Sequence, residues 1–199
     1  MTIYKIGRFL CRLLFSSVMK AQVIGKENIP EDRAVLLCSN HISNFDPPLV
    51  GSFLKRQVHY LAKEELFQKK VIGPLLNALG AFPVKRGMGD RQALRKGLGL
   101  LEEGKVLCLF PEGTRSRTGE IGKGLSGAGF FALRSNAVII PVAVLGDYKP
   151  FKRVTVVYGK PISFQELRDK KINAAIATEV IMNSIQETRD QVSRTYVKG

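Results

Sequence analysis

Short apolar runs alternate along this chain with segments in which apolar residues recur every three or four positions. The short runs are typical of buried strands, whereas the repeating segments are typical of helices that face a core. We predict strands at residues 21–26, 34–38, 58–62, 81–84, 106–110, 138–145 and 154–158. We predict helices at residues 47–55, 64–79, 91–103, 130–136 and 174–192. This alternation predicts an α/β fold, a single domain in which helices flank a mixed, largely parallel central sheet.

Prolines modify the pattern in three places. Pro141 has no backbone N–H, so we expect it to break the strand at residues 138–145. Pro83 indicates that the strand at residues 81–84 lies at an edge or an end of the sheet. Gly73 and Pro74 are expected to interrupt the helix at residues 64–79.

We predict that residues 1–20 form an amphipathic helix that precedes a domain at residues 21–199. Six apolar side chains fall on one helix face: Ile3, Ile6, Phe9, Leu10, Leu13 and Leu14. Lys5, Arg8 and Arg12 fall on the opposite face, a pattern typical of a helix lying flat in an anionic membrane interface. The alternative is an ordinary amphipathic helix whose apolar face packs on the domain.

Other membrane-targeting segments are not indicated. No uncharged apolar run approaches the roughly 18 to 20 residues that a membrane-spanning helix needs. Arg8 and Arg12 interrupt the apolar segment, and no small-residue cleavage site follows, which argues against a signal peptide. We therefore predict peripheral (monotopic) attachment to the cytoplasmic face of the membrane.

The net charge points to an anionic partner. The chain of 199 residues carries 31 Lys and Arg against 17 Asp and Glu, a formal charge of +14. On charge alone the partner is a nucleic acid, an anionic bilayer or a phosphorylated substrate. No nucleic-acid-binding motif or basic stripe with interleaved aromatic residues is present, and there is no tryptophan, so we expect no nucleic acid partner.

The three cysteines are widely spaced and form no metal-binding pattern. Cys38 and Cys108 lie within apolar strand-like runs, so we expect them to be buried and reduced. Without a CxxC pair, and with only two distant histidines, no metal site is predicted. A reducing, cytoplasmic compartment fits this usage.

The segment Asn40–Asp46 pairs a histidine with a carboxylate at fixed spacing. His41 follows the strand at residues 34–38, and Asp46 precedes Pro47 and Pro48 at a helix start, with Asp46 expected at the N-cap. This arrangement can bring the two side chains together, so that Asp46 orients His41 as a proton acceptor. The alternative is that Asp46 only caps the helix and His41 is a hydrogen-bonded loop residue.

Two further clusters follow predicted strands. In Phe110–Ser116, Arg115 offers a planar fork suited to phosphate oxygens, and Gly113 permits close backbone approach or a left-handed conformation. In Gly80–Gly87, Lys85 and Arg86 stand where they can bind a phosphate. The alternatives are a solvated turn with a Glu112–Arg115 ion pair, and ordinary surface charges.

Taken together, these segments resemble the glycerophospholipid acyltransferase family, of the type that acylates 1-acylglycerol-3-phosphate (lysophosphatidic acid). Four motifs of that family, NHxxxxD, GxxxxxR, FPEGTRS and a VPV-like segment, correspond here to Asn40–Asp46, Gly80–Arg86, Phe110–Ser116 and Ile140–Val142. The sequence departs from the family pattern in two ways. Ile140 replaces the usual valine. The N-terminal segment shows no convincing membrane span, whereas many relatives have one or two. The resemblance covers nearly the whole chain after residue 20.

The resemblance implies acyl transfer to the sn-2 hydroxyl of lysophosphatidic acid, which gives phosphatidic acid in phospholipid biosynthesis. It assigns His41 and Asp46 to catalysis, with His41 as the general base. It assigns substrate binding to a second set of residues: Lys85, Arg86, Glu112, Gly113, Thr114 and Arg115. The acyl donor is acyl-CoA or acyl carrier protein, acting as a co-substrate, and no cofactor is implied.

Three other functions stay open at this point. The acceptor could be glycerol-3-phosphate or another lysophospholipid. The chain could also be a basic membrane-binding module without activity, although such a module would be expected to lose His41 or Asp46, and both are present.

Overall fold

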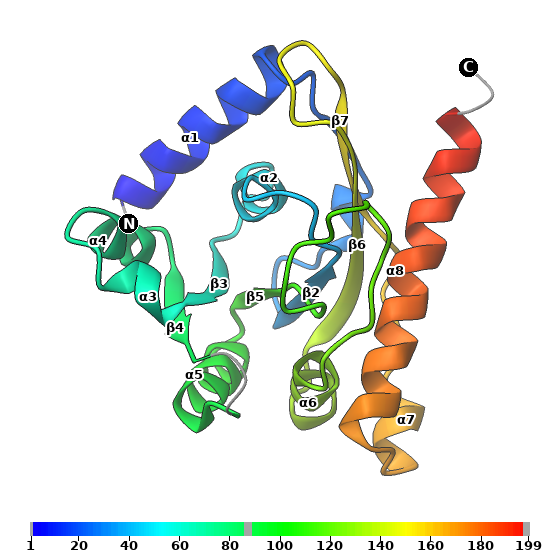
Figure 1. The fold of residues 1–199 in the computed structure, drawn as a ribbon. Coiled ribbons are helices and arrows are strands. Elements are labelled where there is room, and N and C mark those ends of the chain that lie inside the picture. The colour runs from blue at the N-terminus through cyan, green and yellow to red at the C-terminus, as the bar shows by residue number, and fades with distance from the viewer. Residues whose placement is uncertain (1, 86–88, 197–199) are drawn as a thin grey trace.

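The computed structural model describes residues 2–85 and 89–196 (Figure 1). The strands are β1 (Gln22–Ile24), β2 (Val35–Ser39), β3 (Val58–Lys63), β4 (Ala81–Val84), β5 (Val106–Leu109), β6 (Val138–Gly146) and β7 (Val154–Tyr158). The helices are α1 (Thr2–Ser17), α2 (Asp46–Ser52), α3 (Glu64–Phe67), α4 (Ile72–Ala78), α5 (Arg91–Glu102), α6 (Gly127–Arg134), α7 (Gln165–Asp169) and α8 (Ala174–Tyr196). Every predicted strand is present, and α7 is the one α-helix of the described residues that lies outside any predicted segment.

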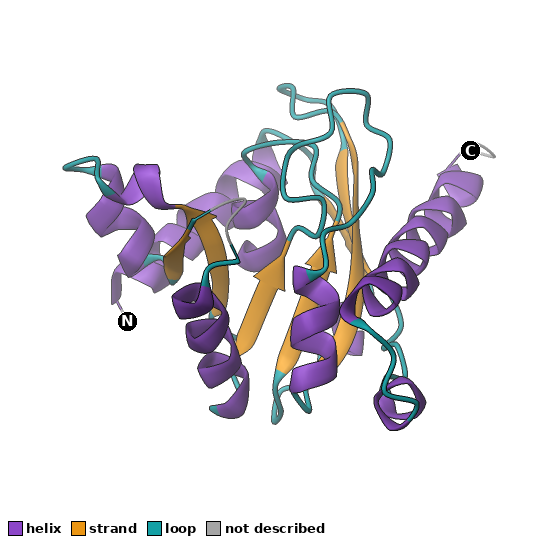
Figure 2. Ribbon diagram, turned by 60° about the horizontal axis from the view of Figure 1, so that its bottom comes forward, coloured by secondary structure: helices purple, strands orange, loops and turns teal. Residues whose placement is uncertain are grey.

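The strands form one sheet in the order β1-β7-β6-β2-β5-β3-β4. All neighbouring pairs are parallel except β6 and β7, which are antiparallel. The predicted single α/β domain with a mixed, largely parallel sheet is therefore confirmed. Because β2 to β5 run in the same direction, the loops that follow them meet at one edge of the sheet, where long loops gather (Figure 2).

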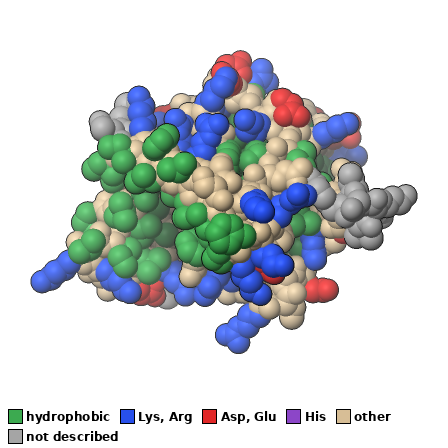
Figure 3. All heavy atoms as spheres, turned by 90° about the horizontal axis from the view of Figure 1, so that it is seen from above, with side chains coloured by type: hydrophobic (Ala, Val, Ile, Leu, Met, Phe, Trp, Pro, Cys, Tyr) green, Lys and Arg blue, Asp and Glu red, His purple; other side chains and the backbone are tan. Residues whose placement is uncertain are grey.

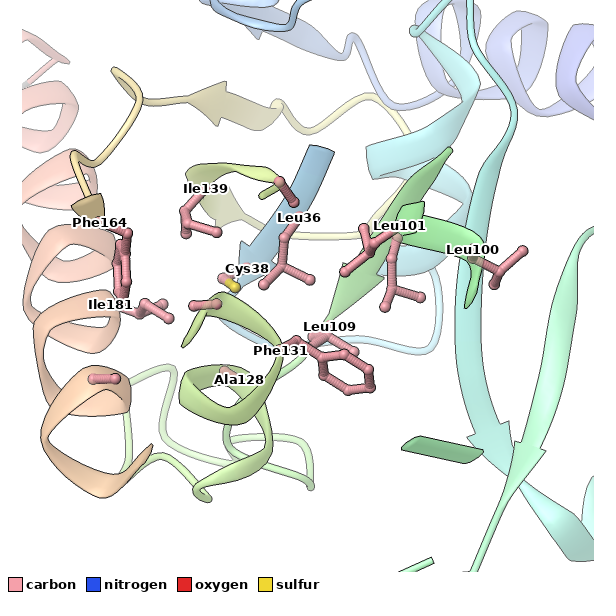
Figure 4. Close-up of a cluster of buried hydrophobic side chains, with 14 of the residues drawn as sticks. Leu36, Cys38, Leu100, Leu101, Leu109, Ala128, Phe131, Ile139, Phe164 and Ile181 are labelled. Carbon is pink, nitrogen blue, oxygen red and sulfur yellow. The ribbon is translucent and has the colours of Figure 1, made fainter. Parts of the chain in front are cut away.

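Each face of the sheet is covered by its own hydrophobic cluster. On one face, α5, α6 and α8 pack through side chains such as Leu101, Phe131 and Ile181 (Figure 4). On the other face, α1 and α2 pack through Phe15 and Leu49. The central strands β2 and β5 are buried throughout, which explains why they are short, uninterrupted apolar runs.

Pro141 lies inside β6, so the predicted break of this strand is wrong. The Pro141 carbonyl accepts a hydrogen bond from the Gly159 N–H at 2.8 Å, just beyond the end of β7. Since the regular pairing of β6 with β7 begins at Val142, the missing N–H removes one bond at the end of that ladder. On its other side β6 stays paired with β2 as far as Ser39 and Val142.

The predicted helix at residues 64–79 is interrupted earlier than expected. It is divided into α3 and α4, so the break lies at residues 68–71. Gly73 and Pro74 instead lie in the first turn of α4, where a proline costs no helix hydrogen bond. Gly73 is needed there because a Cβ atom would lie 2.2 Å from the Phe67 carbonyl oxygen.

The apolar face of α1 points away from the rest of the protein. The six side chains predicted to share this face are exposed to between 41% (Leu14) and 65% (Phe9). Viewed from above, hydrophobic side chains gather on the side where Figure 1 places α1, with Lys and Arg side chains around them (Figure 3). The alternative in which this face packs on the domain is therefore wrong.

A different side of α1 holds the helix on the domain. Tyr4 and Phe15 are buried, and the Tyr4 hydroxyl accepts a hydrogen bond from the Val58 N–H at 3.0 Å. Arg8 donates to the carbonyls of Leu54 and Lys55, at 3.0 and 2.6 Å, just beyond the end of α2. These bonds fix Arg8 on the turn that follows α2, so its guanidinium is held against the domain instead of facing solvent.

The close crossing of α6 and α8 generates a stability prediction. A Cβ atom on Gly129 would lie 2.0 Å from the Ala174 carbonyl oxygen, so Gly129→Ala should lower the free energy of unfolding by about 1–3 kcal/mol. Gly99→Ala is the matched control, because it lies within α5 with no atom near its Cβ position, and it should raise stability by about 0.5–1 kcal/mol. Urea unfolding measures both, and equal effects of the two substitutions would contradict the crossing geometry.

Candidate active site

His41 and Asp46 form a hydrogen-bonded pair at the carboxyl edge of the sheet. His41 follows β2, and Asp46 begins α2 five residues later. The His41 Nδ1 atom lies 2.7 Å from Asp46 Oδ2. The end of β2 is fixed beside β6 by Asn40, whose side chain bonds both the N–H and the carbonyl of Val144, at 2.7 and 2.9 Å. The predicted contact is present, and the catalytic roles of the two residues stay a prediction.

Asp46 is fully buried and bonded at both carboxylate oxygens. Its Oδ2 accepts the N–H groups of Ile42 and Ser43, each at 2.7 Å, in addition to the His41 ring. Phe45 occupies the N-cap position and Asp46 is the first residue of α2, so the predicted N-cap role of Asp46 is wrong by one residue. The carboxylate turns back to the preceding turn because that turn supplies three donors.

The His41 ring is held in a defined orientation with one nitrogen left for chemistry. The Phe110 ring stacks on it at a centroid distance of 4.3 Å and an interplanar angle of 29°. An ionised carboxylate only accepts, so Nδ1 carries the hydrogen and Nε2 carries the lone pair. Within residues 2–85 and 89–196 no side chain or backbone group bonds Nε2, and the His41 side chain is 13% exposed. This geometry suits a proton acceptor facing an incoming hydroxyl.

Glu112 holds the loop after β5 against His41. Its Oε1 accepts the His41 N–H and its Oε2 accepts the Gly122 N–H, both at 3.0 Å. The same loop is joined to His41 a second time, because the Ser116 N–H donates to the His41 carbonyl at 2.7 Å. No Glu112–Arg115 ion pair exists between these two described residues, so that part of the sequence interpretation is wrong. The expected substrate contact of Glu112 stays a prediction.

The other predicted binding residues lie at different distances from the pair. Gly113 has φ +67°, which confirms its left-handed conformation, and Thr114 and Arg115 are exposed beside it. The hydrogen bond of Ser116 keeps Arg115 next to His41. Lys85 follows β4 and pairs with Glu64 at 3.7 Å. Because β5 and β3 separate β4 from β2, Lys85 starts about three strand spacings, roughly 14 Å, from the end of β2.

One predicted residue lies outside the described part of the chain. Arg86 belongs to residues 86–88, so its expected role in phosphate binding stays a prediction.

Tyr148 reaches the site although it belongs to none of the motifs identified in the sequence. Its hydroxyl donates to Asp46 Oδ1 at 2.6 Å, across 102 positions of sequence. Burial, together with the neighbouring Asp46 charge, raises the pKa of Tyr148, so the phenol stays protonated and can donate. The only sequence signal is indirect: Gly146 and Asp147 mark a turn after β6, at the edge where the site lies.

Comparison with known proteins places this geometry in a family. The model of the family described as Acyltransferase matches residues 20–145. A 1-acyl-sn-glycerol-3-phosphate acyltransferase of Bacillus subtilis (strain 168) is 31% identical over 200 residues, which cover 96% of this chain and 99% of that protein. The chain belongs to the acyltransferase family.

Two other proteins are similar to this acyltransferase over most of its length. A probable 1-acyl-sn-glycerol-3-phosphate acyltransferase of Mycoplasma pneumoniae is 27% identical, with 98% of this chain and 77% of that protein covered. The crystal structure of the 1-acyl-sn-glycerophosphate (LPA) acyltransferase PlsC of Thermotoga maritima superimposes with a TM-score of 0.68 at 27% identity, covering 94% of this chain and 78% of that one. The family resemblance inferred from the motifs is therefore confirmed.

The described residues contain neither a membrane-spanning helix nor a metal-binding cluster. No helix among residues 2–85 and 89–196 is long and apolar enough to cross a membrane. No group of three or more His, Cys, Asp or Glu side chains in the same part of the chain is arranged to hold a metal ion.

Proposed function

We propose that this acyltransferase transfers a fatty acyl group from an acyl thioester to the sn-2 hydroxyl of 1-acylglycerol-3-phosphate, forming phosphatidic acid. The observation that carries the proposal is the 2.7 Å contact between His41 Nδ1 and the buried Asp46 carboxylate. This contact leaves Nε2 as an acceptor at the edge of the sheet. The names of the relatives in Bacillus subtilis and Mycoplasma pneumoniae support the same acceptor.

The proposed reaction is a direct transfer with His41 as the general base. Nε2 accepts the hydroxyl proton while the hydroxyl oxygen bonds to the thioester carbonyl carbon. Collapse of the tetrahedral intermediate breaks the carbon–sulfur bond, and the departing thiolate takes the proton back from the imidazolium. Asp46 stabilises the transient positive charge on His41 through Nδ1. This direct transfer requires neither an acyl-enzyme intermediate nor a cofactor.

Arg115 is the best-placed residue to bind the phosphate of the acceptor. It follows β5, the direct neighbour of β2, and its loop is bonded to His41 through Ser116 and Glu112. Its side chain is exposed and forms no ion pair or hydrogen bond with another described residue, so its guanidinium is available for a ligand. Lys85 follows β4, two strands further from β2, so it can contact an acceptor that extends along the carboxyl edge of the sheet.

We further propose that α1 attaches the enzyme peripherally to an anionic membrane, with its exposed apolar face in the interface. Burying one large apolar side chain contributes about 1.5–3 kcal/mol, so the six side chains together can provide the main part of the binding free energy. Lys5 and Arg12, which are exposed, supply the attraction to anionic lipid. Phosphatidic acid, lysophosphatidic acid and an acidic carrier protein all suit the charge of +14.

The first prediction concerns the base. His41→Ala should lower transfer of a labelled acyl group to lysophosphatidic acid by about 10²–10⁴, the usual contribution of a general base. The matched control is His59→Gln, because His59 is the second histidine of the sequence and its Nδ1 lies 3.2 Å from a carbonyl, that of Gly80. Glycerol-3-phosphate and lysophosphatidylglycerol are run as acceptors, with acyl-CoA and acyl carrier protein as donors. Retention of more than about a tenth of the activity by folded His41→Ala would remove the base assignment.

The second prediction concerns the phosphate. Arg115→Ala should raise the KM for lysophosphatidic acid about tenfold, the loss expected for one charge-assisted hydrogen bond, with kcat little changed. Arg117→Ala is the control, since Arg117 is an exposed cation of the same loop without a proposed role. An unchanged KM in Arg115→Ala, or an equal rise in both variants, would exclude Arg115 from the phosphate site.

The third prediction concerns membrane attachment. Deleting residues 1–20 would also remove the buried Phe15 and Met19, so point substitutions on the exposed face are the sharper test. Phe9→Gln and Leu13→Gln should each weaken binding to vesicles rich in phosphatidylglycerol about tenfold, as measured by co-sedimentation. Ile176→Gln, an exposed apolar residue of α8, should bind like the unchanged protein. Undiminished binding of the Phe9→Gln, Leu13→Gln double variant would show that this face is not the anchor.

A further inference from the structure

The two oxygens of the Asp46 carboxylate are held by different parts of the chain. Oδ2 accepts from His41, Ile42 and Ser43, which all belong to the turn before α2. Oδ1 accepts from one side chain of the described residues, Tyr148 in the loop between β6 and β7. The torsion that rotates an Asp carboxylate is broad and roughly two-fold, so only its hydrogen bonds restrain the plane of the group. Rotation moves both oxygens together, so the donor on Oδ1 adds to the restraint that the donors on Oδ2 provide.

The Tyr148 ring is itself held between α1 and the turn that carries Asp46. Its centroid lies 6.5 Å from that of Phe15 in an edge-to-face arrangement, and 5.8 Å from that of Phe45. Phe15 is one of the largest fully buried side chains and anchors the end of α1. The ring therefore has little freedom to leave Asp46 while α1 stays in place.

The loop that carries Tyr148 and the start of β7 are also bonded to the residues just after α1. The Phe151 N–H donates to the Val18 carbonyl at 2.6 Å, and the Val154 N–H donates to the Met19 carbonyl at 3.2 Å. Phe151 has φ +61°, a left-handed conformation that costs a residue with a Cβ atom roughly 1 kcal/mol. Phe151 keeps this strained conformation where the loop bonds to Val18, so the position of the loop depends on α1.

We infer that Tyr148 is a positioning residue for the reaction, and that α1 holds it there through Phe15 and the residues 147–153 loop. Tyr148 adds a bond on Oδ1 that resists rotation of the Asp46 carboxylate, which keeps Oδ2 directed at His41 Nδ1 while the imidazole gains and returns a proton. The inference rests on the proposed function, because it assumes that His41 is the base. It makes α1 part of the support of the active site as well as of the membrane-facing surface.

Tyr148→Phe tests the hydroxyl while keeping the ring. We expect kcat to fall about 10- to 100-fold, by analogy with the loss found when a hydrogen-bond partner that orients a metal-ligating side chain is removed. The KM values for lysophosphatidic acid and for the acyl donor should stay within about twofold, because the tyrosine touches neither substrate. The matched control is Tyr158→Phe: the Tyr158 hydroxyl donates to the Val50 carbonyl on α2 at 2.6 Å, so it supports the same helix without touching Asp46. Tyr158→Phe should change the unfolding midpoint and leave kcat within about twofold.

A spectroscopic readout separates positioning from general destabilisation. The chain has two histidines, so nitrogen-15 NMR of the imidazole rings gives two sets of signals, assigned with His41→Ala. Tyr148→Phe should move the His41 ring signals and leave those of His59 in place, whereas Tyr158→Phe should move neither. Unchanged His41 signals together with a kcat near that of the unchanged enzyme would overturn the inference. So would an equal loss of kcat in Tyr158→Phe, because that result would reflect loss of packing alone.

The contribution of α1 is tested by a double-mutant cycle. Phe15→Leu should lower kcat by less than Tyr148→Phe, since it loosens the ring without removing the hydroxyl. The double variant should lose no more than about the loss of Tyr148→Phe alone, because both changes act on one contact. Fully additive losses would overturn the link between Phe15 and Tyr148.

Failure of this inference and failure of the proposed function give different results. If unchanged enzyme transfers acyl groups, His41→Ala does not, and Tyr148→Phe does so at full kcat, only the role of Tyr148 is wrong. If folded His41→Ala still transfers, the base assignment is wrong and the NMR result alone decides whether Tyr148 orders the pair.

Discussion

The fully buried carboxylate of Asp46 is the constraint on which the arrangement of the site depends. Burying a charged group away from water is strongly unfavourable unless hydrogen bonds replace the lost hydration. Four donors satisfy this one carboxylate: two backbone N–H groups, the His41 ring and the Tyr148 hydroxyl. To supply them, the end of β2, the start of α2 and the loop after β6 must all meet. The position of His41 follows from this requirement.

The single antiparallel pairing of the sheet, between β6 and β7, makes that meeting possible. A parallel strand after β6 would require a crossover that returns the chain to the opposite edge of the sheet. Because β7 runs antiparallel to β6, the connection between them is short and stays at the carboxyl edge, beside the ends of β2 and β5. Tyr148 lies in this connection. The antiparallel pairing of β6 with β7 therefore places the Tyr148 hydroxyl, the fourth donor, beside Asp46.

The local features of this protein could be predicted from sequence because local rules decide them. The runs at β2, β5 and β7 are apolar and short, and the predicted bounds of β7 agree with those observed. His41 follows a predicted strand and Asp46 begins a predicted helix five residues later, so their contact could be anticipated as one of two interpretations. Tyr148 could not be found in this way, because its contact with Asp46 depends on the order of strands and not on spacing. The same is true of Arg8, whose bonds to the end of α2 arise from packing.

The helix α1 packs on the domain with one face and exposes an apolar face to the outside. Its buried side, with Tyr4, Arg8 and Phe15, is fixed to the domain by hydrogen bonds and packing. Its exposed side carries six large apolar residues that a protein in water has no reason to keep together on one face. Since Arg8 is bonded to the carbonyls of Leu54 and Lys55, the membrane attachment proposed for α1 relies on Lys5 and Arg12 for attraction to anionic lipid. Under the proposed function this division has a use, because the helix proposed to face the lipid also packs against the loop beside His41.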